Sequence, residues 1–345
     1  MINTNVLAID LAKNSFQVCK TDKFGRVIFN KALSRKQLLI LLANEKQSFV
    51  AMESCGGTHY WCRKAKGFGH KVIAISARRV KAFRQGQKTD ASDALAISQA
   101  ALQPNTKPSR LLSEYEQCLQ GCERIREALV DDKVALTNQV RGLLMELGIV
   151  INKGDSHLLK RLPEILEDGE NGMSFQFRAC LKIQYERLKQ LLIDIKLVEK
   201  QINIAIQDDV DCQRLQKLEG IGTVNFLSLK IALGNPEHFK NGREAAACFG
   251  ATPVQHSTGG KERIGSISKY TANKRLRSKL YLGAMAVINQ LDKREIKTEK
   301  ERWLKSLLAR RGKKVAAIAL VNKTIRTAYA LLKNNQDYKP QILAA

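Results

Sequence analysis

Acidic residues are scarce in this sequence of 345 amino acids. It has 33 Asp and Glu against 58 Lys and Arg, which leaves a formal net charge of +25 at pH 7. A surplus of this size is expected to attract a polyanionic partner, either a nucleic acid or an anionic membrane surface. With only 6 prolines and 22 glycines, the composition does not indicate a disordered or collagen-like chain. The length allows two or three folded domains.

Long apolar runs and paired cysteines are also missing. No apolar run reaches the roughly 18 to 20 residues that span a bilayer, and the start, MINTNVLAID, lacks the basic and apolar regions of a secretory signal. The eight cysteines contain no CxxC pair, so we expect reduced, packed thiols in a cytoplasmic protein. Cys55, His59 and Cys62 are close in sequence, but their spacing matches no common zinc motif. We therefore favour nucleic acid over a membrane as the partner.

The first hundred residues predict a mixed α/β domain. Short β-like segments occupy residues 5–12, 15–21 and 26–33, and buried strands are expected at 47–54 and 71–77. Helices are expected at 34–45, 58–69 and 89–103. The order β-β-β-α-β-α-β-α is that of the RNase H-like fold, which also underlies RuvC-type junction nucleases and many transposases. We therefore predict an RNase H-like (RuvC-like) domain over residues 1–108.

Two long helices are expected between residues 109 and 210, at about 113–147 and about 174–209. The second carries a heptad stripe, formed by Leu181, Leu188, Ile195 and Ile202 with Leu191, Val198 and Ala205. Such a seam needs a partner helix, either the first long helix or the same helix of another subunit. We favour a coiled-coil arm that dimerises.

The region 211–345 is predicted to be mostly helical and strongly basic. Gly220-Ile221-Gly222 resembles a helix-hairpin-helix turn that exposes backbone N–H groups to a phosphate, although a plain packing turn has the same composition. From Lys261 onward there are 21 Lys and Arg against 6 Asp and Glu, which favours binding to phosphate backbones over a merely solvated surface. The candidate nucleic-acid-binding residues are Arg78, Arg79, Lys88, Gly220, Gly222, Lys261, Arg263, Lys269 and Arg277.

Four acids occupy positions that this fold would bring together. Asp10 ends the first strand, Glu53 ends the fourth, and Asp90 and Asp93 share one face of the helix after the fifth. Singly, each has an ordinary explanation as a helix-capping or strand-end residue. Together they would repel one another unless divalent cations neutralised them, and oxygen ligands select Mg²⁺ or Mn²⁺. Two such ions can activate an attacking oxygen and stabilise a leaving oxygen at a phosphodiester.

A second candidate for chemistry is a Ser-Thr-Gly-Gly loop. Ser257 and Thr258 precede two glycines, and Lys261 and Arg263 follow closely. A hydroxyl in this setting could attack phosphorus while the cations stabilise the charge on the phosphoryl oxygens. The composition by itself favours an ordinary turn, since Ser, Thr and Gly are common in loops.

These motifs, in this order, resemble the DEDD transposases of the insertion sequence 110 family, and most closely its 1111 group. The resemblance covers about residues 4 to 290 and rests on AIDLAK, AMESCGG, KTDASDA, LEGIG, CFGATPVQHSTGGKERIGSISK and the pair Leu276-Arg277. It departs at Lys269 to Asn273, where the family often has Lys-x-Gly-Asn or Lys-x-Gly-Asp and this chain lacks the glycine and is one residue longer. This difference affects the expected shape of that loop.

The resemblance implies a site-specific recombinase that moves a DNA element in the bacterial cytoplasm, at the nucleoid. It implies that Asp10, Glu53, Asp90 and Asp93 bind Mg²⁺ and that Ser257 is the nucleophile, with Thr258 as the fallback. It further implies a noncoding bridge RNA that pairs with donor and target DNA, and a dimer or dimer of dimers with a composite site. The alternatives are a RuvC-type structure-specific nuclease, a Piv-like DNA invertase and a non-catalytic architectural protein that binds nucleic acid.

Overall fold

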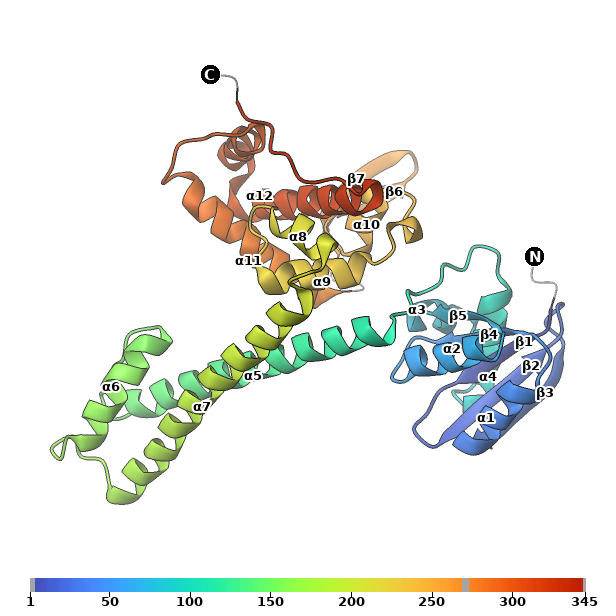
Figure 1. Cartoon of the computed structure of the whole chain (residues 1–345), viewed down its shortest axis with the longest axis horizontal. Helices are drawn as coiled ribbons and strands as arrows, with labels where there is room; N and C mark the ends of the chain where they lie inside the picture. The colour runs from blue at the N-terminus through green and yellow to red at the C-terminus, as the bar shows by residue number, and fades with distance from the viewer. Residues whose placement is uncertain (1–3, 269–272, 344–345) are drawn as a thin grey trace. The chain divides into compact units, whose positions relative to one another are not determined.

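The chain forms two compact units, which follow one another along the sequence. The computed structural model describes residues 4–268 and 273–343 (Figure 1). The first unit runs from Met1 to Tyr115 and the second from Glu116 to Ala345. The first is mixed α/β and the second is mostly helical, so this part of the sequence prediction is confirmed.

A five-stranded sheet forms the centre of the first unit. Its order is β3-β2-β1-β4-β5, and the strands are β1 (Val6–Asp10), β2 (Ser15–Thr21), β3 (Val27–Ser34), β4 (Phe49–Glu53) and β5 (Lys71–Ile75). The first three strands pair antiparallel, whereas β4 is parallel to β1 and β5 is parallel to β4. The carboxyl ends of β1, β4 and β5 therefore lie at one edge of the sheet.

Both faces of this sheet are covered because β1 is apolar on both sides. Leu7 and Ile9 face one core cluster, which includes residues of α1 (Arg35–Asn44) and α2 (Thr58–Gly67). Val6 and Ala8 face the other cluster, which is formed largely by α4 (Asp90–Leu102). The alternation follows from the two-residue period of a strand. Between β5 and α4 lie the short α3 (Ala77–Val80) and η1 (Lys81–Phe83).

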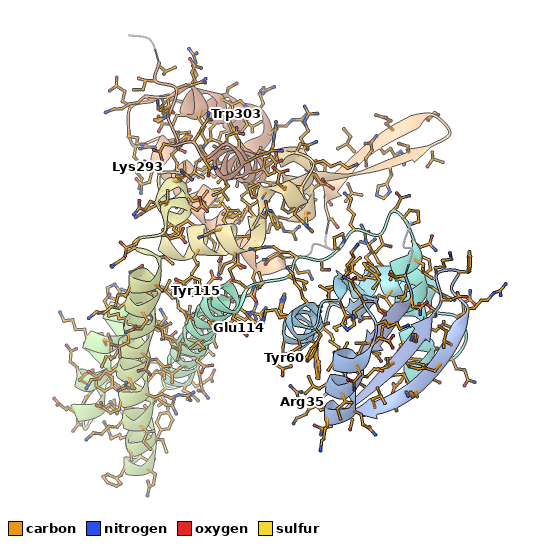
Figure 2. The ribbon with its side chains drawn as sticks, turned by 45° about the vertical axis from the view of Figure 1, so that its right-hand side comes forward. Arg35, Tyr60, Glu114, Tyr115, Lys293 and Trp303 are labelled. Atoms are coloured by element: carbon orange, nitrogen blue, oxygen red, sulfur yellow. The ribbon has the colours of Figure 1, made fainter. Side chains whose placement is uncertain are left out.

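Helices α1 and α2 are joined by an aromatic and cationic contact. The guanidinium of Arg35 lies 5.2 Å from the ring centroid of Tyr60 and 5.0 Å from that of Trp61 (Figure 2). The Trp61 ring in turn packs edge-on against Phe16 of β2, with their centroids 4.9 Å apart. This cluster fixes the helical layer to the sheet.

Three helices form the first part of the second unit: α5 (Glu114–Met145), which starts two residues before the boundary, α6 (Asp155–Glu167) and α7 (Phe175–Ile206). Leu136, Val140 and Leu144 of α5 form one core with residues of α6 and with Leu181 and Leu188 of α7. All four main heptad residues of α7 are at most 8 % exposed. The stripe that we expected to dimerise is therefore covered within the chain, because α5 and α6 fold against it.

The remaining helices form the C-terminal part of the second unit. They are α8 (Val210–Gln216), α9 (Thr223–Leu233), η2 (Pro236–His238), α10 (Gly242–Cys248), α11 (Lys274–Leu291) and α12 (Glu299–Asn334). An antiparallel hairpin of β6 (Pro253–Thr258) and β7 (Lys261–Ile267) interrupts them, where the sequence suggested a loop. Buried Glu123 of α5 ties these helices to the long-helix region, since it accepts hydrogen bonds from Lys279 of α11 at 3.0 Å and from Ser228 of α9.

Among the described helices, α12 has the length and composition of a membrane span. One 18-residue stretch of it has a mean hydropathy of 1.3, but 56 % of that stretch is buried within the structure. Residues such as Ala317, Leu320 and Ile325 face the core. Apolar composition here therefore matches the role of a core helix.

The turn between α8 and α9 depends on a close backbone approach at Gly220. This residue has a φ of +76°, and a Cβ atom added there would lie 2.8 Å from the carbonyl oxygen of Gly283. We expect Gly220→Ala to lower the free energy of unfolding of the second unit by about 1–3 kcal/mol, as overpacking usually does. Urea unfolding followed by circular dichroism measures this change.

Gly142→Ala is the matched control for this substitution. Gly142 lies within α5, and nothing lies within 4 Å of the Cβ that alanine would add. Alanine should stabilise the helix there by up to about 1 kcal/mol. Equal effects of the two substitutions would contradict the packing role of Gly220.

Candidate functional site

Two of the four predicted acids lie side by side at the edge of the sheet. Asp10 is the last residue of β1 and Glu53 is the last residue of β4. The two strands are parallel neighbours, and the pairing of Ile9 with Met52 makes Asp10 and Glu53 the next residues in register. Both carboxylates are partly buried.

The other two acids lie on the first turn of α4, and neither caps that helix. Thr89 is the N-cap and its hydroxyl accepts a hydrogen bond from the backbone N–H of Ser92, while the Ser92 hydroxyl accepts one from the backbone N–H of Thr89. The capping box thus uses Thr89 and Ser92. The ordinary explanation of Asp90 and Asp93 as N-cap and N3 residues is therefore wrong.

Two of the acids, Asp10 and Glu53, have raised pKa values. Burial and the negative charges of Asp93, Asp90 and Glu53 raise the pKa of Asp10 to about 6. Burial and the charge of Asp93 also raise the pKa of Glu53, against the opposing effect of Arg84 and Lys88. Mutual repulsion of this kind requires that the carboxylates share one neighbourhood.

Arg84 interacts with two of these acids, Asp93 and Glu53. It lies between η1 and α4, and its guanidinium forms an ion pair of 3.3 Å with Asp93. Arg84 was not predicted from the sequence, although it belongs to the basic stretch before α4. It neutralises one of the four acids and leaves the repulsion at Asp10 largely uncompensated.

The carboxylate oxygens of the four acids suit a hard divalent cation, but the side chains are not close enough together to hold one. Asp10, Glu53, Asp90 and Asp93 offer only oxygen ligands, which Mg²⁺ and Mn²⁺ prefer. Among the described residues, no three Asp, Glu, His or Cys side chains come together closely enough to hold an ion. The structure therefore gathers the predicted acids in one neighbourhood, and their joint ligation of metal stays a prediction.

A fixed turn carries the chain away from Glu53. The Thr58 hydroxyl donates to the backbone carbonyls of Glu53 at 2.8 Å and of Cys55 at 3.0 Å, and accepts from the N–H of Cys55 at 2.9 Å. Cys55 is exposed, Cys62 is buried, and His59 accepts from the N–H of Leu112. In the described part of the chain these three residues do not form a group that could hold a metal ion.

Ser257 and Thr258 lie at the end of β6, on an exposed hairpin. Gly259 and Gly260 form its turn with φ values of +55° and +77°, the left-handed conformation that two-residue hairpins favour. Ser257 is paired across the strands with Glu262, and Thr258 is paired with Lys261. Directly paired residues share a face of the ladder. The expected cations therefore lie beside Thr258 and His256, while the cross-strand neighbour of Ser257 is an acid.

The predicted nucleic-acid-binding residues differ in their exposure to solvent and in their contacts within the protein. Arg277 donates to the backbone carbonyls of Gly250 at 3.1 Å and Ser268 at 2.6 Å, so it braces the base of the hairpin. Gly220 has the packing role described above, and Gly222 lies at the exposed start of α9. The remaining candidates Arg78, Lys88, Lys261 and Arg263 are exposed, Arg79 is partly buried, and Lys269 lies outside the described residues.

Both units match models of one transposase family. Residues 7–149 match a model described as a transposase, of the DEDD type of IS110. Residues 212–301 match a model described as the transposase IS116/IS110/IS902 family. Together the two matches cover more than half of the chain, and they include the acids and the hairpin.

Curated transposases are similar along the whole chain. A protein of Pseudomonas aeruginosa named "Probable family 20 transposase" is 36% identical over 344 residues, which are 98% of this chain and 100% of that protein. The transposase for insertion sequence element IS1111A of Coxiella burnetii is 33% identical over 98% of this chain and 92% of its own length. The transposase for insertion sequence element IS1328 of Yersinia enterocolitica is 33% identical over 96% of this chain and 97% of its own length.

The raised pKa of Asp10 predicts a pH-dependent destabilisation. Because the folded protein binds this proton more tightly than the unfolded chain, the contribution of Asp10 to stability decreases as pH rises from about 4 through about 6. Asp10→Asn removes that penalty. In metal-free buffer its melting temperature should match the wild type near pH 4 and exceed it by a few degrees near pH 7.

Thermal melts of both proteins in EDTA measure this difference. Asp22→Asn serves as the control, since Asp22 lies in the turn after β2 and accepts hydrogen bonds from Phe24 and Arg26 instead of meeting other acids. A constant difference between Asp10→Asn and wild type at all pH values would show that the four acids do not interact as described.

Proposed function

Because this chain belongs to the IS116/IS110/IS902 family of insertion-sequence transposases, we propose that it breaks and rejoins DNA strands by phosphoryl transfer at the acidic edge of its sheet. The observation that carries this proposal is the shared neighbourhood of four carboxylates, expressed in the raised pKa of Asp10. Perturbed ionisation in a cluster of acids is typical of a site that does chemistry. The products would be an excised element and a newly inserted one.

The fold assigned to the first unit in this proposal is RNase H-like, of the RuvC type. Support comes from the sheet order β3-β2-β1-β4-β5, with three antiparallel strands followed by two parallel ones. The helices after β3, β4 and β5 cover both faces, which leaves the carboxyl ends of β1 and β4 open at the edge. Ligands of open α/β sheets bind at such strand ends.

Asp10, Glu53, Asp90 and Asp93 would hold Mg²⁺, or Mn²⁺ in its place. When bound, such ions supply positive charge that neutralises the acids and polarises a phosphodiester. The chain itself contributes the rigid placement of Asp10 and Glu53 on neighbouring strands. It also contributes a helix whose caps leave Asp90 and Asp93 available, and an arginine that already holds Asp93.

Ser257 would act as the nucleophile. Its oxygen forms a bond to phosphorus, the bond from phosphorus to the leaving sugar oxygen breaks, and the proton of the serine hydroxyl is passed on to that oxygen. The resulting phosphoseryl ester keeps the energy of the broken bond, so a second hydroxyl can reseal the strand. Thr258 remains the fallback, and its pairing with Lys261 places a cation beside it.

The partners follow from charge and from the family. DNA would be the substrate, and a noncoding bridge RNA would select the sites by base pairing. The excess of 21 Lys and Arg over 6 Asp and Glu from Lys261 onward supports binding to phosphate backbones. A dimer or dimer of dimers would assemble through the long-helix region, by surfaces other than the α7 stripe that the chain itself covers.

Asp90→Asn tests the acidic site. The substitution keeps the shape of the side chain and removes one charge, while Thr89 and Ser92 still cap α4. We expect strand exchange on a plasmid that carries the element to decrease by about a hundredfold or more, because even indirect partners of a metal site commonly cost 10- to 100-fold. Nucleic-acid binding, measured by gel shift, should stay near wild type.

Asp131→Asn, an exposed acid in the middle of α5, is the control for this experiment. It should support normal strand exchange. A fully active Asp90→Asn protein would favour the architectural alternative, in which the acids have no catalytic part.

Ser257→Ala tests the covalent step. Denaturing gels of reactions with labelled DNA should show a protein–DNA adduct for the wild type and none for the variant, with DNA binding retained. Thr258→Ala, the neighbouring hydroxyl, should still form the adduct. Cleavage without an adduct in the wild type would instead favour a RuvC-type nuclease that uses water.

A further inference from the structure

A cavity of about 1100 Å³ lies within the C-terminal part of the second unit. Its walls come from the start of α10, the start of β6 and both segments of α12. We call it the Trp303 groove, after the residue that Figure 2 labels on α12. Arg243, Trp303, Asn322, Lys323 and Arg326 line it together with apolar residues such as Ile318.

Gly312 makes this groove possible by breaking α12. Its φ of +73° and ψ of 170° interrupt the helix, so the chain changes direction between two helical segments. Trp303 of the first segment thereby meets Lys323 of the second, whose ammonium nitrogen lies 4.5 Å from the indole ring. On the other wall, Gly242 lets α10 approach closely, since a Cβ there would lie 3.3 Å from the Cα of Arg326.

Positive charge predominates in the lining of the groove. Arg243, Lys323 and Arg326 line it, and no acid does among its described lining residues. Within the described part of the chain, no ion pair joins any of these three cations to a carboxylate. Burial and the charges of Lys300 and Arg326 lower the pKa of Lys323, against the opposing effect of Glu219. Three cations in a lining that contains no acid among its described residues are suited to bind an anion.

Apolar and aromatic surface lies beside this charge. Trp303 is half-buried, and Val315 is 53% exposed although it lines the groove. Asn322 is held in place because its amide donates to the carbonyl of Ala251 at 3.0 Å. An indole next to several cations can stack a base and bind the adjoining phosphate. A peptide helix would use the apolar surface but would leave the three cations without partners.

We propose that the Trp303 groove binds an unpaired nucleotide of a nucleic-acid strand, with the base against Trp303 and the phosphate on Lys323, Arg326 and Arg243. The volume is slightly above the roughly 300–1,000 Å³ of common ligand pockets and exceeds the need of a single inorganic anion. The inference rests on the proposed function only in requiring a nucleic-acid substrate. It adds a strand-holding site to the second unit, apart from the acids and from Ser257.

Tryptophan fluorescence of the full-length protein tests this site. The chain has two tryptophans, and Trp61 is only 2% exposed in the core of the first unit, so a ligand-dependent change reports on Trp303. We expect single-stranded DNA and RNA of about eight nucleotides to quench the emission. The tighter of the two strands identifies the natural source of the nucleotide, and either result supports the site.

Two substitutions separate stacking from charge. In gel shifts with labelled strands, Trp303→Ala should weaken binding between about fivefold and a hundredfold, as the loss of one stacked base does, and Trp303→Phe should restore most of it. A strand with one abasic position at the bound nucleotide should bind the wild type more weakly than the intact strand does. Trp303→Ala should bind the abasic strand and the intact strand equally well. Arg326→Ala should reduce the slope of log affinity against log salt by about 0.7 for one lost phosphate contact.

Lys305→Ala is the matched control, because Lys305 is an exposed cation on the same segment as Trp303 and does not line the groove. It should leave quenching by the strand intact. Circular dichroism confirms the fold of each variant. Unchanged Trp303 emission with both strands, or equal binding by wild type, Trp303→Ala and Arg326→Ala, would overturn the proposal. Strand exchange by Asp90→Asn is independent of this result, so the failure of either idea can be recognised.

Discussion

The burial of carboxylates close to one another is the constraint on which the candidate site depends. Asp10 and Glu53 end neighbouring parallel strands, and Asp90 and Asp93 begin the helix that covers β1. The fold places negative charges near one another and partly buries them, which raises the pKa of Asp10 to about 6. Such an arrangement is unfavourable by itself and needs a cation to stabilise it. Arg84 meets only part of this need, because its ion pair is with Asp93.

The hydrophobic layers hold that arrangement in place. Each residue of β1 from Val6 to Ile9 is fully buried, alternately against α4 and against the helices of the opposite face. Asp10 is the first residue of the strand that is not fully buried. The strand therefore cannot slip by one residue without moving both apolar sets to the wrong face, so the register of Asp10 against Glu53 is fixed by packing.

Much of the first unit could be predicted from the sequence, because most of its strands are short and apolar and because α1 and α4 begin at capping boxes. The four acids were found for the same reason, since each lies at the end of a recognisable element. Arg84 was missed because its ion pair with Asp93 depends on the course of the backbone between η1 and α4. No local sequence pattern predicts that course. The hairpin of β6 and β7 was missed as well, because its exposed strands lack the alternation of a half-buried sheet.

In the second unit, sequence patterns predicted where the helices are, but they did not predict which helices pack against one another. The heptad stripe of α7 was evident, but a stripe does not state which helix covers it, and α6 became visible as a partner only in the structure. Basic composition likewise did not separate cations that face solvent from cations used inside the fold. Arg277 holds the backbone at the base of the hairpin, whereas Arg243 and Arg326 line an open groove.

The register of the hairpin limits how its serine can work. Because Glu262 is the cross-strand neighbour of Ser257, the hairpin itself opposes the negative charge that develops when a hydroxyl attacks a phosphodiester. Lys261 and Arg263 pair instead with Thr258 and His256. In the proposed reaction, cations from outside the hairpin must therefore stabilise the phosphoryl group at Ser257.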